Sequence, residues 1–201
     1  ISLMISLQQI QQVLFLDIET VSSEAEFENL SPEWQQLWAD KTRFQRQEES
    51  PEGFYPKRAA ILAEFGKVVC ISCGFFTLQN GHWEFRIKSF ADEDELMLFG
   101  QFAQLLERLP NYRLCAHNGK EFDFPYLSRR MIAHEIKLPG QLNNAGKKPW
   151  EVPHIDTMEL WKFGDYKNFT SLKLLAAMFG IPSPKDDIDG SKVGSVYWQE
   201  K

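Results

Sequence analysis

The strongest constraint on the fold is the stretch VLFLDIET, residues 13–20, in which four apolar residues lead into two acids. An uninterrupted apolar run of this kind is typical of a strand that is covered on both faces. Strand side chains alternate between faces, so Asp17 and Glu19 point the same way, about 6.5 Å apart along the chain. Adjacent carboxylates at the end of a buried strand repel each other and resist desolvation, so a compensating partner is expected.

Length and composition predict one globular domain. The chain has 201 residues, of which 43% are hydrophobic, and this suits a single packed core. No apolar segment is long enough to span a bilayer, and the N-terminal ISLMISLQQIQQ lacks the features of a signal peptide, so we expect a cytoplasmic protein without a membrane partner. The three cysteines, Cys70, Cys73 and Cys115, are too few for a disulfide framework and are expected to be small core thiols.

Charge is distributed unevenly along the chain. Residues 1–100 carry a formal charge of −8 and residues 101–201 carry +2, which together make the net charge of −6. An acidic chain does not suit a simple electrostatic clamp on nucleic acid. Any surface that faces phosphates should therefore come mainly from the second half.

The segment that follows the first strand, at about residues 22–64, is expected to be an insertion. Ser31 and Pro32 are a good cap and first-turn pair, which predicts a helix there. The helix carries a stripe at helical spacing, formed by Trp34, Leu37, Trp38 and Lys41. Such a stripe is more typical of packing than of base stacking.

Two β-rich runs and a helix follow the insertion. GKVVCISCGFF and HWEFRIKSF are separated by TLQNG, whose Asn80 and Gly81 predict a tight hairpin. The next segment, which ends before Pro110, predicts a helix that opens with a capping box of Asp92 and Glu95. The face that this helix should bury consists of Leu96, Phe99, Ala103 and Leu106.

Strands and helices alternate in the second half. YRLCAH predicts a strand, FDFPYLSRRMIAHE a helix with Pro125 in its first turn, and HIDTMEL a short strand or turn. TSLKLLAAMFGIP predicts a last helix, with a shared face formed by Leu172, Leu175, Ala176 and Phe179. Residues 147–149 and 183–195 are expected to be loops. Strands first and alternation later predict a mixed sheet with helices on its faces.

A third acid has a placement similar to that of the first two. Asp123 follows the strand YRLCAH by a short loop and lies at or next to a helix N-terminus. Taken alone, it reads as a helix cap. If its strand neighbours the first strand, Asp123 converges with Asp17 and Glu19 on one patch. A divalent cation would then balance their charge, since Mg²⁺ binds carboxylate oxygens and keeps water ligands that a phosphate substrate can replace.

These segments carry a resemblance to a known family. DIET followed by HNGKEFDFPYL resembles the first two motifs of the DEDD superfamily of 3′-to-5′ exonucleases. EFGKVVCIS and SLKLLAAMFGIPSPKDDIDGSKVGSVYW are similar to the predicted exonuclease family related to the proofreading domain of family B DNA polymerases. The resemblance implies a ribonuclease H-like fold: a five-stranded mixed sheet, its first three strands antiparallel, flanked by helices and with a helical insertion after the first strand.

The resemblance also implies an activity, in which two divalent cations, Mg²⁺ or Mn²⁺, hydrolyse terminal phosphodiesters at a single-stranded or frayed 3′ end, with DNA favoured. Asp17, Glu19 and Asp123 are then the catalytic residues and metal ligands. The implied substrate-binding residues are Thr20, Asn118, Phe122 and Phe124. Asn118 is expected to brace its loop, and for the two phenylalanines core packing is favoured over a nucleotide pocket.

One element of the family pattern is not found in the sequence. DEDD enzymes have a third motif, and in relatives of this protein it would be a Tyr-x-x-x-Asp helix beyond SVYWQEK. Tyr197 has Lys201 four residues later, and Asp156 matches a position beside the site. We therefore expect that the chain was shortened and that, at this length, it binds metal weakly and cleaves poorly.

Two other interpretations stay open on sequence alone. LFLDIET also resembles the nucleophile motif of haloacid dehalogenase-like phosphatases, in which Asp17 would attack phosphate, with KDDIDG as a late acidic motif. A non-catalytic module that binds nucleic acid or protein on the same fold is the third. The four histidines, His82, His117, His134 and His154, have no ligand spacing and are expected to be structural. The sequence leaves the oligomeric state undetermined.

Overall fold

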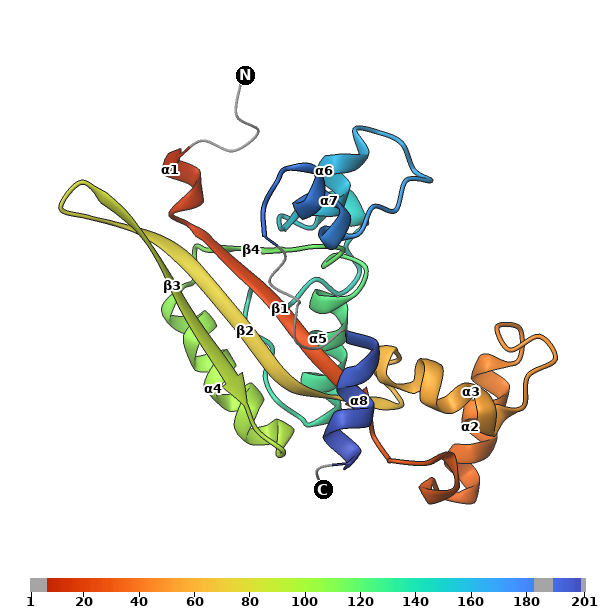
Figure 1. Ribbon diagram of the computed structural model, residues 1–201. Helices are drawn as coiled ribbons and strands as arrows, with labels where there is room; N and C mark the ends of the chain where they lie inside the picture. Colours follow the sequence, from red (N-terminus) through yellow and green to blue (C-terminus); the bar gives the residue numbers. More distant parts are fainter. Residues whose placement is uncertain (1–6, 183–189, 200–201) are drawn as a thin grey trace.

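The computed structural model describes residues 7–182 and 190–199, and its centre is a five-stranded sheet of order β3-β2-β1-β4-β5 (Figure 1). The strands are β1 (Val13–Ser22), β2 (Gly66–Gln79), β3 (His82–Ala91), β4 (Arg113–Ala116) and β5 (Ile155–Asp156). The longer helices are α2 (Pro32–Thr42), α3 (Pro51–Arg58), α4 (Glu95–Arg108), α5 (Asp123–Ala133) and α8 (Gly190–Gln199). The shorter helices are α1 (Leu7–Ile10), α6 (Thr157–Lys162) and α7 (Leu172–Met178), with 3₁₀ turns η1 (Phe27–Asn29), η2 (Ala59–Ile61) and η3 (Pro149–Glu151).

The pairing of the strands confirms the predicted mixed sheet. β1 runs antiparallel to β2, and β2 runs antiparallel to β3 through a turn in which Asn80 and Gly81 both have positive φ, 51° and 80°. That turn geometry matches the right-handed twist of the two strands, which is why Asn-Gly is favoured there. β4 is parallel to β1 and β5 is parallel to β4, so the ends of β1, β4 and β5 lead toward one edge of the sheet.

The main core lies between the sheet and the helices α4 and α5. Leu14, Leu16 and Ile18 of β1 belong to one cluster with the apolar faces of these helices. Because strand side chains alternate, Phe15, Asp17 and Glu19 point to the opposite face of the sheet. The apolar run at the start of β1 is thus used on both faces, and the two acids share the face that α4 and α5 do not cover.

The inserted segment has a small core of its own. α2 starts at Ser31 and Pro32 as predicted, and the Ser31 hydroxyl accepts a hydrogen bond from the Trp34 backbone N–H. Trp38 is fully buried, and its ring packs against Tyr55 and Phe65 at centroid distances of 5.1 Å. The prediction of a packing role is correct for Trp38, whereas Trp34 is 43% exposed. In Figure 1 this insertion projects to the lower right of the sheet.

Two expectations for α4 are wrong. The N-cap is Asp94, whose carboxylate accepts from the Leu96 N–H, and Glu95 does not close a capping box with Asp92. Glu95 turns inward instead, where it is 5% exposed and pairs with Arg130 and His134. With Glu95 turned inward, the face of α4 that packs on the core differs from the predicted face. Its buried apolar residues are Leu98, Phe99, Phe102 and Leu106. Leu96, which was expected on that face, is 50% exposed.

The C-terminal elements also differ from expectation. On α7 only Leu175 and Ala176 of the predicted face are buried, while Leu172 and Phe179 are 49% and 61% exposed. Of the predicted loop 183–195, residues 183–189 lie outside the described residues, and the rest begins α8. α8 lies across the end of β1 (Figure 1), where the Trp198 indole N–H donates to the Ser22 hydroxyl over 3.1 Å. Within the described ranges, none of the helices has the length and apolar character to cross a bilayer.

Candidate active site

The site begins where the ladder between β1 and β4 stops. Along β1, β4 pairs with Val13, Leu14 and Phe15, so the following residues of β1 extend past the end of β4. The chain leaves β4 at Ala116, passes through a loop at residues 117–122, and enters α5 at Asp123. The backbone N–H of Ile18 lies close enough to the Asp123 carboxylate to lower its pKa, which places the start of α5 beside the open edge of β1.

Asp123 is a buried acid with an acidic environment. Its side chain is 3% exposed, and burial raises its pKa to about 7, helped by the charge of Asp17 and, less strongly, that of Asp156. Hydrogen bonds from the Ile18 and Asp123 backbone N–H groups act in the opposite direction. The structure thus brings Asp123 close enough to Asp17 for their charges to repel, and both charged groups that act on Asp123 are carboxylates.

Asp17 and Glu19 share one face of β1, as the alternation of the strand predicts. Asp17 is exposed and stands opposite Ser72 of β2, whereas Glu19 is half-buried and stands opposite Cys70. Among the described residues, no group of three or more Asp, Glu, His or Cys side chains has an arrangement that could hold a metal ion. The structure therefore places Asp17 near Asp123. It does not bring the three predicted ligands, Asp17, Glu19 and Asp123, into an arrangement that could hold a metal ion.

Asp156 organises the loop in front of Asp123. Its carboxylate, 3% exposed, accepts hydrogen bonds from the backbone N–H groups of Asn118 at 2.9 Å and Lys120 at 3.1 Å. It also caps α6, because it accepts from the N–H groups of Met158 and Glu159. Four donors satisfy this buried charge and hold the loop at a fixed distance from β5. Asp156 sits where a cap of α6 is expected, directly before the helix, but its contacts with the loop carry no local sequence signal.

The predicted substrate-binding residues have different surroundings. Asn118 lies in the loop with a positive φ of 63°, which asparagine tolerates better than most residues. The Thr20 side chain lies beside the Tyr126 hydroxyl, which donates to the Ala60 carbonyl over 2.9 Å. Phe122 is half-buried, with its ring 5.4 Å from that of Tyr126. Phe124 is 2% exposed and packs 4.9 Å from the His154 ring, which is the core position that the sequence favoured.

His117 connects the site loop to the segment after α6. Its Nδ1 lies 2.9 Å from the Thr157 hydroxyl, and its Nε2 lies 2.8 Å from the Thr170 carbonyl oxygen. A carbonyl only accepts, so Nε2 carries the proton and donates. This is the structural role that was expected for the histidines. Sequence reasoning gave no indication that His117 ties two distant points, Thr157 and Thr170, to the loop.

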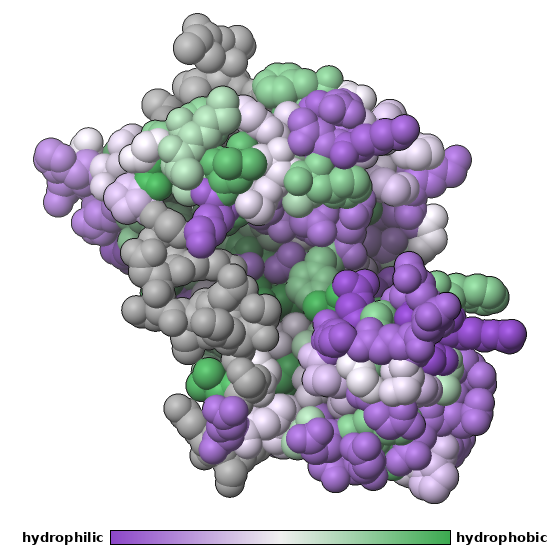
Figure 2. All heavy atoms as spheres, turned by 45° about the vertical axis from the view of Figure 1, so that its right-hand side comes forward, coloured by the Kyte–Doolittle hydropathy of each residue, from purple (hydrophilic) through white to green (hydrophobic). Residues whose placement is uncertain are grey.

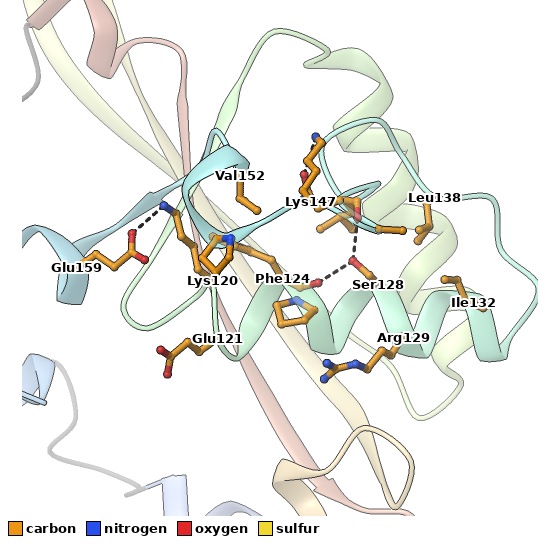
Figure 3. A pocket seen from close by; sticks show the side chains of 15 residues that line it. Lys120, Glu121, Phe124, Ser128, Arg129, Ile132, Leu138, Lys147, Val152 and Glu159 are labelled. Atoms are coloured by element: carbon orange, nitrogen blue, oxygen red, sulfur yellow. Dashed lines mark hydrogen bonds and ion pairs between the residues drawn. The ribbon is translucent and has the colours of Figure 1, made fainter. Parts of the chain in front are cut away.

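A cavity of about 440 Å³ lies between α5, the end of the loop before it and the segment after it (Figure 3). Its lining includes the apolar side chains of Phe124, Ile132 and Leu138. At its edge Lys120 forms a 2.7 Å ion pair with Glu159 of α6, which neutralises the lysine charge nearest in sequence to Asp123. Neither Asp17 nor Asp123 lines this cavity. The acids and the cavity are therefore separate features.

The comparison with solved structures identifies the fold. The structure of the family B DNA polymerase from the hyperthermophilic archaeon Pyrobaculum calidifontis is similar with a TM-score of 0.57, over 93% of this chain and 21% of the polymerase chain. Sequence identity over this match is 18%, so the similarity shows the fold. It confirms the predicted ribonuclease H-like architecture with its mixed sheet. A search of curated proteins gave no match.

A family model supplies the assignment. Residues 61–201 match the family described as "Predicted 3'-5' exonuclease related to the exonuclease domain of PolB". The matched residues include Asp123 and Asp156 but start after β1, so Asp17 and Glu19 enter the comparison through the structural similarity alone. The match covers well over half of the chain. The chain therefore belongs to the family of predicted 3′-to-5′ exonucleases related to the exonuclease domain of PolB.

Proposed function

We propose that this chain is a metal-dependent 3′-to-5′ exonuclease domain that removes nucleotides from single-stranded or frayed 3′ ends, with DNA as the favoured substrate. The observation that carries the proposal is the pairing of Asp17 with the buried Asp123 at the open edge of β1. Burial of one carboxylate beside another costs free energy, and enzymes arrange such pairs where a cation or a proton has to be held.

The residues fit a hard divalent cation. Asp17 and Asp123 offer oxygen atoms only, and neither of the two charged groups that act on Asp123 is a cation. Asp17, Glu19 and Asp123 would hold one or two Mg²⁺ or Mn²⁺ ions, which lower the pKa of an attacking water and stabilise the leaving 3′ oxygen. The protein itself contributes the position of these carboxylates.

The acids and the loop beside them are positioned by contacts that are already present in the structure. Asp156 accepts hydrogen bonds from the backbone N–H groups of Asn118 and Lys120, and the Ile18 N–H lies beside the Asp123 carboxylate. Thr20 lies beside the Tyr126 hydroxyl. Because these contacts involve backbone groups of β1, the loop and α6, the acids need little reorganisation when substrate binds.

The test is hydrolysis of a 5′-labelled single-stranded DNA in Mn²⁺ or Mg²⁺, with Asp17→Asn and Asp123→Asn beside the wild type. Asp40→Asn is the matched control, because Asp40 is exposed on α2 in the insertion. In line with the poor cleavage expected from the sequence, we expect a slowly formed ladder of products that shorten from the 3′ end, loss of the ladder in both site variants and in chelator, and no change in the control. RNA of the same sequence, added as competitor, measures the preference for DNA.

Two results would overturn the proposal. A ladder that persists in Asp17→Asn or in chelator would exclude these acids as the catalytic group. A mobility shift without hydrolysis, combined with no Mn²⁺ binding, would favour a non-catalytic binding module. The phosphatase interpretation gains no support from the family match, and part of its late acidic motif, residues 185–189, lies outside the described residues.

A further inference from the structure

A group of exposed aromatic rings lies in the segment between α6 and α7. Phe163 is 76% exposed, Tyr166 is 90% exposed and Phe169 is 66% exposed. Lysines alternate with them: Lys162, Lys167 and Lys173 lie in the same stretch, which holds Asp165 as its single acid. Residues 162–173 thus carry a formal charge of +2 in a chain of net charge −6. We call these three rings and three lysines the aromatic–lysine surface.

The backbone under this surface is held in place by its own hydrogen bonds. The Asp165 N–H donates to the Lys162 carbonyl over 2.8 Å, and the Asp165 carboxylate accepts from the Lys167 N–H over 3.1 Å. Lys162 places its ammonium 4.4 Å from the centroid of the Phe169 ring. Phe163 has a φ of 45°, a conformation that is costly for a bulky side chain. An ordered segment that holds its rings in water costs little further ordering when they bind a ligand.

The surface is connected directly to the candidate active site. α6 starts at the residue after Asp156, and at 1.5 Å per residue its six residues span about 9 Å. His117 of the site loop bonds to Thr157 and to Thr170, one on each side of the exposed rings. In Figure 2 hydrophobic and hydrophilic groups alternate on the upper part of the molecule, where α6 and α7 lie in Figure 1, above a hollow in its centre.

We propose, on the basis of the proposed exonuclease function, that the aromatic–lysine surface binds the single-stranded part of the substrate, a few nucleotides before its 3′ end. Aromatic rings on which bases stack, beside cations that meet phosphates, are what sequence-tolerant single-strand binding requires. The positive charge of this stretch favours a polyanion over a basic or neutral protein partner. It also places the phosphate-facing surface in the second half of the chain, where the charge distribution predicts it.

The test is equilibrium binding of fluorescent single-stranded DNA in chelator, so that hydrolysis plays no part. The principal variant is Phe163→Ala/Tyr166→Ala/Phe169→Ala, and the matched control is Phe44→Ala, because Phe44 is 91% exposed in the acidic insertion. We expect the principal variant to weaken binding of an oligonucleotide of about 16 nucleotides by well over tenfold, and of one of about 4 nucleotides by much less. The control should bind as the wild type does.

A second variant separates charge from stacking. Lys162→Gln/Lys167→Gln/Lys173→Gln should lower the slope of log Kd against log salt by about 2, since each lost phosphate contact removes roughly 0.7 for a single strand. Lys137→Gln, an exposed lysine just beyond the end of α5, is the control and should leave the slope unchanged. Far-ultraviolet circular dichroism of all variants excludes unfolding as the cause.

The outcomes distinguish this inference from the exonuclease proposal. At a saturating concentration of the longer oligonucleotide in Mn²⁺, the triple-alanine variant should still hydrolyse it, because the acids and not the surface carry the chemistry. Unchanged affinity in the triple-alanine variant would overturn the inference while leaving hydrolysis at the acids intact. The inference would also be overturned if the triple-alanine variant abolished self-association of the chain in sedimentation experiments without affecting DNA binding. The exposed rings would then form a contact with a second copy of the chain.

Discussion

Replacing Asp123 with asparagine tests the account of the buried acid most sharply. Burial and the Asp17 charge raise the pKa of Asp123 from an ordinary value of 3.8 to about 7. A difference of about three pK units corresponds to roughly 4 kcal/mol, the free energy that ionisation of this group costs the fold. The folded chain binds the proton more tightly than the unfolded chain. This group therefore makes stability fall as pH rises from about 4 to about 7, with no further change above that range.

The variant should therefore have a pH-dependent effect. In chelator at about pH 8, Asp123→Asn removes the cost of the charge but weakens two charge-assisted hydrogen bonds of about 1 kcal/mol each, which leaves a net stabilisation of roughly 1–3 kcal/mol. At about pH 5 the wild-type carboxyl is protonated in the fold, so the variant should gain nothing or be slightly less stable. Urea unfolding at both pH values measures the two free energies.

Asp156→Asn is the matched control for this experiment. Asp156 is as buried as Asp123, but four backbone N–H groups satisfy its carboxylate, so the amide should destabilise the fold at both pH values. The reasoning fails if Asp123→Asn destabilises equally at pH 5 and pH 8. That result would show that a carboxylate at this position is compensated within the fold.

Three further predictions concern stability and thiol chemistry. Glu95→Gln breaks a buried ion pair with Arg130 and should lower the free energy of unfolding in urea by roughly 3 kcal/mol. Glu84→Gln, in an exposed pair, should change it little. Equal effects would contradict the structural role of Glu95. Gly66→Ala places a Cβ 2.3 Å from the Tyr126 hydroxyl oxygen and should lower the free energy of unfolding by roughly 1–3 kcal/mol. Gly100→Ala, in open space on α4, should raise it. A Gly66 variant as stable as the wild type would refute this packing. Burial raises the pKa of the Cys73 and Cys115 thiols to about 11 and about 12. A thiol reagent at about pH 8 should therefore modify the half-buried Cys70 first and the other two only after denaturation. Equal modification rates at all three cysteines would contradict their burial.

Local signals in the sequence were sufficient for much of the fold. The Asn80-Gly81 turn, the Ser31-Pro32 helix start and the alternation of β1 depend on contacts within a few residues, and the structure has all three. Glu95 shows where such reasoning fails. Its spacing to Asp92 fits a capping box, but Arg130 and His134 lie far along the chain and form a stronger set of partners once α5 packs on α4.

The same limit applies to the site. The sequence predicted that Asp123 converges with Asp17 and Glu19 if its strand neighbours the first strand; β4 does neighbour β1, and the charge of Asp17 acts on Asp123. The order of the strands had to be assumed for this argument, and the sequence contains no direct record of it. The links made by Asp156 and His117 join points about 40 residues apart and have no local pattern, so only the folded chain reveals them.

Binding of Mn²⁺, followed by its paramagnetic resonance signal, tests the central claim that Asp17 and Asp123 form a shared cation site. We predict that the wild type binds Mn²⁺ and that Asp17→Asn and Asp123→Asn each weaken binding by about tenfold or more, since each removes a carboxylate ligand. Asp40→Asn should bind as the wild type does. Equal affinity in the wild type and both site variants would contradict the account, because the repulsion around Asp123 would then have no cation to balance it.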